Sequence, residues 1–209
     1  MGKAERLKAA RAAERAASHE RAPLVMLTRA VKVVGALFGT EPECAHAAAL
    51  LKMIGDHLGY DLTPRAVSLV ATETSTGSKA FLGPRADELI DETDRHKLEV
   101  HLPEEGDTGH MVLTSEDPMM LFDPNLPQLI RLGIFAEPLL FPIASTDPPE
   151  LEWRVSRGSL SLLYLPDGNQ ALVSTYQEAL VDFAARAAQI AGFLRKGALP
   201  EDIHFGPKR

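Results

Sequence analysis

The amino-acid sequence predicts an α+β protein, in which helices and strands occupy separate parts of the chain. Apolar residues recur every three or four positions near both ends, over residues 23–58 and 176–194, which is the period of an amphipathic helix. Between these regions, short apolar runs are bounded by Gly, Pro and Asp, which is typical of strands. Runs spaced so closely favour an antiparallel sheet.

The composition fits one globular domain with an N-terminal extension. The chain has 209 residues, of which 45% are hydrophobic, so it is long enough to bury a core. Residues 1–22 combine Ala, Arg, Lys and Glu with few large apolar side chains. We therefore expect a flexible basic helical tail over residues 1–22 and a single domain over residues 23–209.

Two helices are predicted at the start of this domain. The first extends from Pro23 to Phe38. Thr40 is expected to be the N-cap of the second, because Thr40-Glu41-Pro42-Glu43 has the spacing of a capping box. This second helix continues to about Leu58, where Gly59 supplies a stop. Cys44 therefore lies in its first turn.

The middle of the chain is predicted to consist mostly of strands. The buried run Ala66–Ala71 is followed by a polar loop from Glu73 to Gly83 and by a short helix at residues 84–93. The other expected strands are residues 98–102, 110–114, 119–123, 151–155, 159–165 and 170–174. A last amphipathic helix is expected from about Tyr176 to Leu194, with Gly197 closing it.

Charge and cysteine content narrow the partners and the compartment. A net charge of -7 argues against a nucleic-acid partner, because such proteins usually present a basic surface. No run approaches the roughly 20 consecutive apolar residues that span a bilayer, so we expect no membrane partner. With one cysteine and no signal-peptide pattern, we expect a cytoplasmic location. Oligomeric state is left open.

Neither a metal nor a cofactor is expected. Four histidines are candidate metal ligands, but they are spread over several predicted elements: His46, His57, His96 and His101. Gly77-Ser78-Lys79 lacks the earlier glycine and the following helix start of a phosphate-binding loop.

Three residues have the order and placement of a cysteine-nucleophile triad. Cys44 lies at a helix N-terminus, where backbone N–H groups and the helix dipole favour the thiolate. His110 opens a strand and can act as the base, and Asp123 ends the next strand and can orient the imidazole. Gln128 is a weaker candidate that can orient substrate or an oxyanion.

These residues carry a family resemblance. Glu43-Cys44 leads a helix of small residues, Gly109-His110 begins a strand, and Leu121-Phe122-Asp123-Pro124 follows. This order resembles the transglutaminase-like branch of the papain-like cysteine enzymes, over about Thr40 to Leu129. The resemblance implies a Cys-bearing helix packed on an antiparallel sheet, in a papain/transglutaminase-like core. It also implies a thioester at Cys44 and a peptide, protein or small acyl substrate.

The sequence is therefore consistent with two functions. The first is hydrolysis of an amide or ester, or acyl transfer, through Cys44, His110 and Asp123. The second is a catalytically inactive transglutaminase-like protein that binds a partner through residues 73–83 or 134–143. Two acidic neighbours of Cys44, Glu41 and Glu43, favour the second because they oppose thiolate formation.

Overall fold

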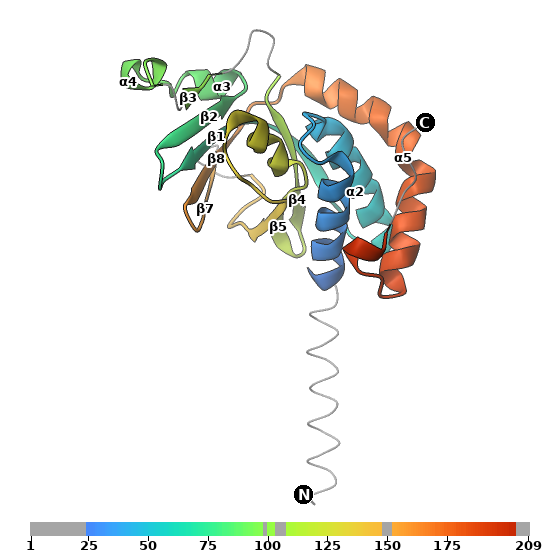
Figure 1. Cartoon of the computed structure of the whole chain (residues 1–209). Coiled ribbons are helices and arrows are strands. Elements are labelled where there is room, and N and C mark those ends of the chain that lie inside the picture. Colours follow the sequence, from blue (N-terminus) through green and yellow to red (C-terminus); the bar gives the residue numbers. More distant parts are fainter. Residues whose placement is uncertain (1–23, 98–99, 103–107, 148–151, 204–209) are drawn as a thin grey trace, which may run out of the picture.

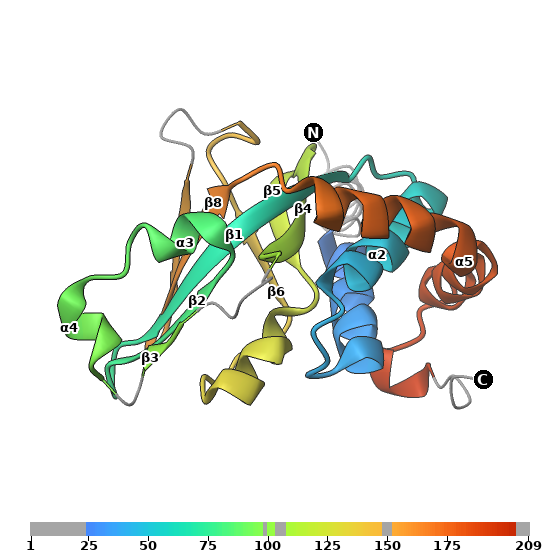
Figure 2. The ribbon, with the colours of Figure 1, turned by 90° about the horizontal axis from the view of Figure 1, so that it is seen from above.

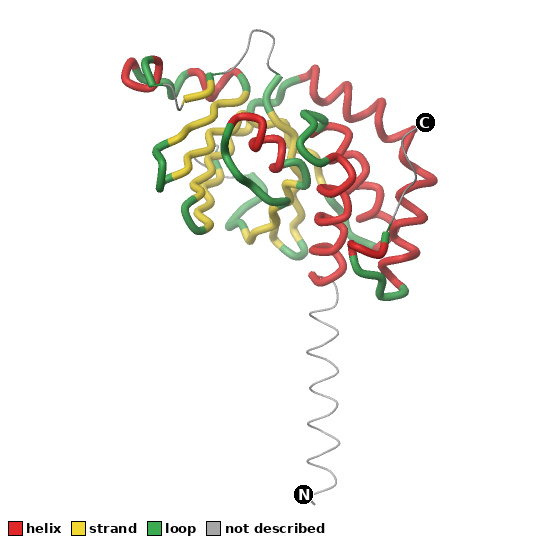
Figure 3. The backbone as a smooth tube through the Cα atoms, viewed as in Figure 1, coloured by secondary structure: helices red, strands yellow, loops and turns green. Residues whose placement is uncertain are grey.

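The computed structural model describes residues 24–97, 100–102, 108–147 and 152–203 (Figure 1). The predicted tail, residues 1–22, lies outside the described residues. Three long helical segments gather on one side of the molecule and the strands on the other (Figure 3). The helices are residues 24–38, α2 (Cys44–Leu58) and α5 (Gln170–Arg195). None of the described helices is long and apolar enough to cross a membrane.

The strands form one sheet in which neighbouring strands are antiparallel, except for β2 and β3. Its strands are β1 (Thr63–Glu73), β2 (Ser78–Leu82), β3 (Val100–His101), β4 (His110–Glu116), β5 (Met119–Asp123), β6 (Leu139–Pro142), β7 (Trp153–Arg157) and β8 (Leu160–Pro166). Short helical segments connect some of them, namely α3 (Pro84–Asp87), α4 (Glu92–Arg95) and η1 (Leu126–Leu132). A further short helix, η2 (Pro200–Asp202), follows α5. The prediction of an α+β fold, with a helix packed on a mostly antiparallel sheet, is confirmed.

Strand β1 is the branch point of the sheet. Val67 pairs with His110 of β4 and also with Pro166 of β8, so β4 and β8 lie on opposite edges of β1. Residues 63–67 of β1 pair with β4, whereas residues 69–73 pair with β2. One edge of β1 therefore changes partner from β4 to β2, and these strands can be followed in Figure 2. The pairing places His110, the first residue of β4, at this change.

Glycine allows the chain to pass this branch point. Gly109 has a φ of 91°, and a Cβ there would lie 2.7 Å from the carbonyl oxygen of Val67. The backbone of Gly83, at the end of β2, lies against the same place. A side chain at Gly109 would thus push His110 away from β1.

The core is divided between the two faces of the sheet. Met111 and Leu113 of β4 belong to the cluster that contains α2 and α5, whereas Val112 lies in the cluster on the other face. Side chains alternate along a strand, so His110 shares the face of Val112. By the same alternation in β5, Asp123 shares the face of Leu121, which also belongs to the second cluster. His110 and Asp123 therefore lie on one face.

The expected start of the second helix is wrong. Helix α2 begins at Cys44, with Glu43 as N-cap and no side-chain cap, so Thr40 is not the N-cap. Residues 39–43 instead reverse the chain between two helices, with backbone hydrogen bonds from Glu41 to Phe38 and from Glu43 to Glu41. The end of the helix is confirmed, because Gly59 adopts the left-handed conformation.

Two further assignments are corrected. Residues 78–82, expected within a loop, form β2, because a turn at residues 74–77 folds them back onto β1. Residues 170–174, expected as a strand, form the first turns of α5. The Asn169 side chain caps this helix by accepting from the backbone N–H of Ala171 at 2.9 Å. Local apolar alternation in residues 170–174 was therefore outweighed by a helix N-cap.

The remaining segments differ in extent. In place of the one short helix expected at residues 84–93 there are two, α3 and α4, and α4 extends to Arg95. The strand expected at 151–155 begins at Trp153 and continues to Arg157, and residue 151 lies outside the described residues. Of the strand expected at 98–102, only residues 100–102 are described, and β3 occupies 100–101. Residues 139–142, for which no strand was expected, form β6 on the edge of β5.

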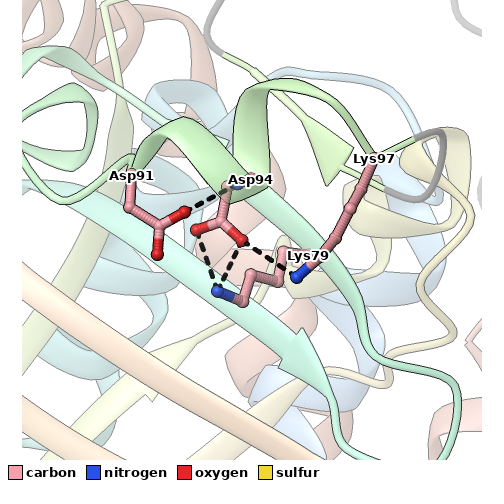
Figure 4. A network of polar contacts seen from close by, with 4 residues as sticks. All are labelled: Lys79, Asp91, Asp94 and Lys97. Carbon is pink, nitrogen blue, oxygen red and sulfur yellow. Dashed lines mark hydrogen bonds and ion pairs between the residues drawn. The ribbon is translucent and has the colours of Figure 1, made fainter.

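A buried ion pair fastens α4 to the sheet (Figure 4). Asp94 is 2% exposed, and its carboxylate accepts from Lys79 of β2 at 2.8 and 2.9 Å. Lys97 lies 3.7 Å from the same carboxylate. The backbone N–H of Asp94 donates to the side chain of Asp91, which caps α4. This network lies on α4, β2 and residue 97, away from the strands that carry His110 and Asp123.

Candidate active site

The three predicted site residues stand at the ends of their elements. Cys44 is the first residue of α2, His110 is the first of β4, and Asp123 is the last of β5. In the β4–β5 pair Leu113 is opposite Phe122, so one step further the register places Asp123 beside Val112. Val112 is the next residue after His110 whose side chain lies on the same face, so Asp123 is a close neighbour of His110 on that face. The tight β4–β5 hairpin makes neighbours of residues that are 13 apart in sequence.

His110 and Asp123 form a direct pair in the interior. Both side chains are 0% exposed, and 2.8 Å separates Nε2 of His110 from Oδ2 of Asp123. The imidazole Nε2–H therefore donates to the carboxylate. This geometry leaves Nδ1 as the ring nitrogen that is not engaged by Asp123.

The environment of His110 favours the imidazolium. Burial lowers the pKa of His110, but the charge of Asp123 and its hydrogen bond raise the pKa. The neighbouring Cys44 side chain makes a smaller contribution in the same direction, and the resulting pKa of His110 is about 10. Cys44 therefore lies near the imidazole, and it is itself buried, with 5% of its surface exposed.

Gln128 lies closer to His110 than the sequence indicated. It is 7% exposed, and its Nε2 is 2.6 Å from Nδ1 of His110. Gln128 belongs to η1, a 3-10 helix that directly follows β5 and ends at the left-handed Gly133. The imidazole is thus held at both nitrogens, by Asp123 on one side and by Gln128 on the other.

Tyr164 is a member of the site that the sequence did not indicate. Its hydroxyl donates to Oδ2 of Asp123 at 2.9 Å, and its side chain is 0% exposed. Burial and the charge of Asp123 raise the pKa of Tyr164 well above 10. In the sequence Tyr164 is one residue in the apolar run Leu160–Leu165, where a buried tyrosine resembles any other core position.

The surroundings of Cys44 include both charge and buried polar atoms. Glu41, expected to oppose a thiolate, lies 3.4 Å from Arg131 of η1, and this cation offsets its charge. The amide of Asn125 approaches the carbonyl of Gly39 at 3.5 Å, so two contacts join η1 and residue 125 to the turn before Cys44. Oδ1 of Asp123 and Oδ1 of Asn125 are buried without a hydrogen-bond partner in the described part of the chain.

The described residues contain no group of three or more His, Cys, Asp or Glu side chains arranged to hold a metal. His46, one of the candidate metal ligands in the sequence, packs edge-on against Phe183 of α5, with ring centroids 6.3 Å apart. Two surface grooves, of about 230 and about 410 Å³, lie near β6 and β7 and share Glu137, Leu139 and Arg157. Their lining residues do not include Cys44 or His110.

Comparisons with known proteins return no significant match to a family model, to a curated protein or to a solved structure. The transglutaminase-like resemblance therefore stays a prediction that depends on the residues of the site.

Proposed function

We propose that this protein is a transglutaminase-like cysteine enzyme that hydrolyses or transfers an acyl group through a thioester on Cys44. One observation carries the proposal. Three residues on three elements, in the order Cys, His, Asp, meet at one buried place, with the His110–Asp123 pair at 2.8 Å and the Cys44 side chain beside the imidazole. A cysteine packed only as core filler has no need of a charged histidine next to it.

The first step is proton transfer from the thiol. Nδ1 of His110 accepts the proton of Cys44, and the resulting imidazolium is stabilised by the carboxylate of Asp123. The pKa of about 10 fits this role, because it keeps His110 protonated at neutral pH once the thiolate has formed. Helix α2 begins at Cys44 and its N-cap residue Glu43 provides no side-chain cap. In this scheme the helix dipole and the backbone N–H groups of the first turn help to stabilise the thiolate.

The acyl steps follow from the same groups. The Cys44 thiolate attacks the carbonyl carbon, and the C–N or C–O bond of the tetrahedral intermediate breaks as His110 returns its proton to the leaving amine or alcohol. A thioester remains. Water or an amine then attacks it, His110 accepts the proton of that nucleophile, and the sulfur leaves as thiolate. Water as acceptor gives hydrolysis, and an amine gives transfer.

Gln128 has two roles in this scheme. Its amide nitrogen donates to Nδ1 when the imidazole is neutral. Turned by half a rotation, the same amide offers its oxygen to the Nδ1–H of the imidazolium. When Cys44 takes over Nδ1, the amide is released and becomes a donor for the oxyanion of the tetrahedral intermediate.

The finer expectations belong to this proposal. They are a papain/transglutaminase-like core, a peptide, protein or small acyl substrate, a cytoplasmic setting, and no partner among nucleic acids or membranes. The arrangement of a Cys-bearing helix on an antiparallel sheet supports the first of them.

The test is the pH dependence of iodoacetamide labelling at Cys44 in the folded protein. We expect labelling to persist well below the ordinary thiol pKa of about 8.5 and to collapse in His110→Ala. His57→Ala is the matched control, because it removes an exposed histidine from α2, the helix that carries Cys44. Slow labelling that is unaffected by His110→Ala would mean that Cys44 is an inert core residue.

The second candidate function is a non-catalytic, partner-binding protein. It is favoured by Phe135, which is 71% exposed in the segment 134–143 and lines the groove of about 230 Å³. It is also favoured by the burial of Cys44. The labelling experiment separates the two, because a binding protein has no use for a thiolate that depends on His110.

A further inference from the structure

Tyr164 reaches the site from a strand that does not carry any of the predicted residues. It lies on β8, which pairs with the edge of β1 opposite to β4. In that pairing Tyr164 is opposite Leu69, and two residues later Pro166 is opposite Val67, the residue that also pairs with His110. Tyr164 and His110 therefore lie on strands on opposite sides of β1, and both contact Asp123 of β5.

The ring of Tyr164 is fixed by packing, independently of the hydrogen bond that its hydroxyl makes to the carboxylate. Phe141 of β6 stacks on it, with ring centroids 6.1 Å apart and planes at 28°. The side chain is 0% exposed and belongs to the core cluster that fills the face of His110 and Asp123. A buried tyrosine hydroxyl needs a partner, and here that partner is Asp123.

Both hydrogen bonds to Asp123 converge on one oxygen. Oδ2 accepts from Nε2 of His110 at 2.8 Å and from the hydroxyl of Tyr164 at 2.9 Å, whereas Oδ1 has no hydrogen-bond partner among the described residues. With His110 alone, the carboxylate could rotate about its Cβ–Cγ bond and present either oxygen. A second donor fixed on Oδ2 removes that freedom.

We propose that Tyr164 is a positioning residue that acts through Asp123 and holds Oδ2 in line with the imidazole Nε2–H. This inference rests on the proposed function, because a fixed imidazole matters most where Nδ1 must meet a thiol and a leaving group. Tyr164 touches neither the sulfur nor the substrate carbonyl in this scheme. The raised pKa of its hydroxyl keeps Tyr164 a donor throughout the working pH range.

The experiment compares the wild type with Tyr164→Phe, which keeps the ring and removes only the donor. We expect the Nε2–H proton of His110, followed by nuclear magnetic resonance, to exchange with water faster in the variant. We also expect labelling of Cys44 at neutral pH to slow about tenfold, which is near the lower end of the range for loss of a hydrogen bond to a charged group. Tyr176→Phe is the control, since Tyr176 is also buried, at 2% exposed, but lies on α5.

The inference is overturned if Tyr164→Phe leaves both the exchange rate and the labelling rate at the wild-type values, or if Tyr176→Phe changes them as much. Should Tyr164→Phe fail to fold, a ring-fluorinated tyrosine at position 164 keeps the shape and strengthens the donor, and slower exchange of the Nε2–H is then expected. Unchanged exchange in the fluorinated protein refutes the proposal.

The two proposals fail in different ways. If the wild-type Cys44 labels slowly and without dependence on His110, the enzyme function is wrong. The exchange of the Nε2–H still reports whether Tyr164 positions the imidazole, because that readout does not involve the thiol. If wild-type labelling is activated and Tyr164→Phe matches it in both readouts, only the role of Tyr164 is wrong.

Discussion

Replacing Asp123 by Asn should convert His110 from a charged to a neutral side chain. The change keeps the size of the side chain and removes the charge that is the largest cause raising the pKa of His110. With a pKa of about 10, His110 is about 99% protonated at pH 8. Burial lowers the pKa of His110, so without the carboxylate we expect a value below the ordinary 6.5. At pH 8 that leaves at most about 3% of the ring protonated.

The assay is a nuclear magnetic resonance titration of histidine ring carbons, with the His110 signal assigned by its absence in His110→Ala. Asp94→Asn is the control, because Asp94 is also a buried carboxylate, 2% exposed, but pairs with Lys79 (Figure 4). It should leave the titration of His110 unchanged. Labelling of Cys44 should fall in Asp123→Asn alone, since a neutral ring cannot hold a thiolate.

Two results would refute this reasoning. If His110 in Asp123→Asn remains protonated at pH 8, the charge of Asp123 is not what raises its pKa. A wild-type His110 that titrates near 6.5 would equally contradict the account, because the buried pair would then not hold a proton in the folded state.

Three other predictions follow from the same contacts. Gly109→Ala should lower the free energy of unfolding in urea by about 1–3 kcal/mol, because its Cβ would meet the carbonyl of Val67 at a φ of 91°; Gly77→Ala, with open space around it, should cost less. Gln128→Leu should speed iodoacetamide labelling of Cys44 about fivefold by freeing Nδ1 of a neutral hydrogen bond, and slow any acyl turnover; equal labelling rates would contradict the competition for Nδ1. The His110–Asp123 pair should stabilise the fold most below about pH 6.5, and this contribution should be lost as the pH rises through about 10, because the folded state keeps a proton that the unfolded chain releases. This is checked by measuring the free energy of unfolding in urea for the wild type and Asp123→Asn across that pH range. A stability difference between the two proteins that grows as the pH rises would contradict the prediction.

The sequence indicated the parts of the site that are marked locally. Cys44 at a helix start, His110 after a glycine turn and Asp123 before a proline each have a local signature, and the short β4–β5 hairpin brings the last two together. Gln128 was named from its nearness to Asp123 in the chain. Tyr164 had no such mark, because it meets Asp123 from a strand 41 residues further along.

By itself, the sequence determined the α+β class, the helices at both ends, and the strands that begin at His110 and Met119, since these depend on periodicity and turn residues within a few positions. The tertiary structure alone decided that residues 78–82 pair with β1 and that both His110 and Tyr164 donate to one oxygen of Asp123. The physical reason is that strand pairing and the pKa of a buried group depend on charges and backbone partners contributed by distant segments, and local sequence patterns do not record which segments will meet.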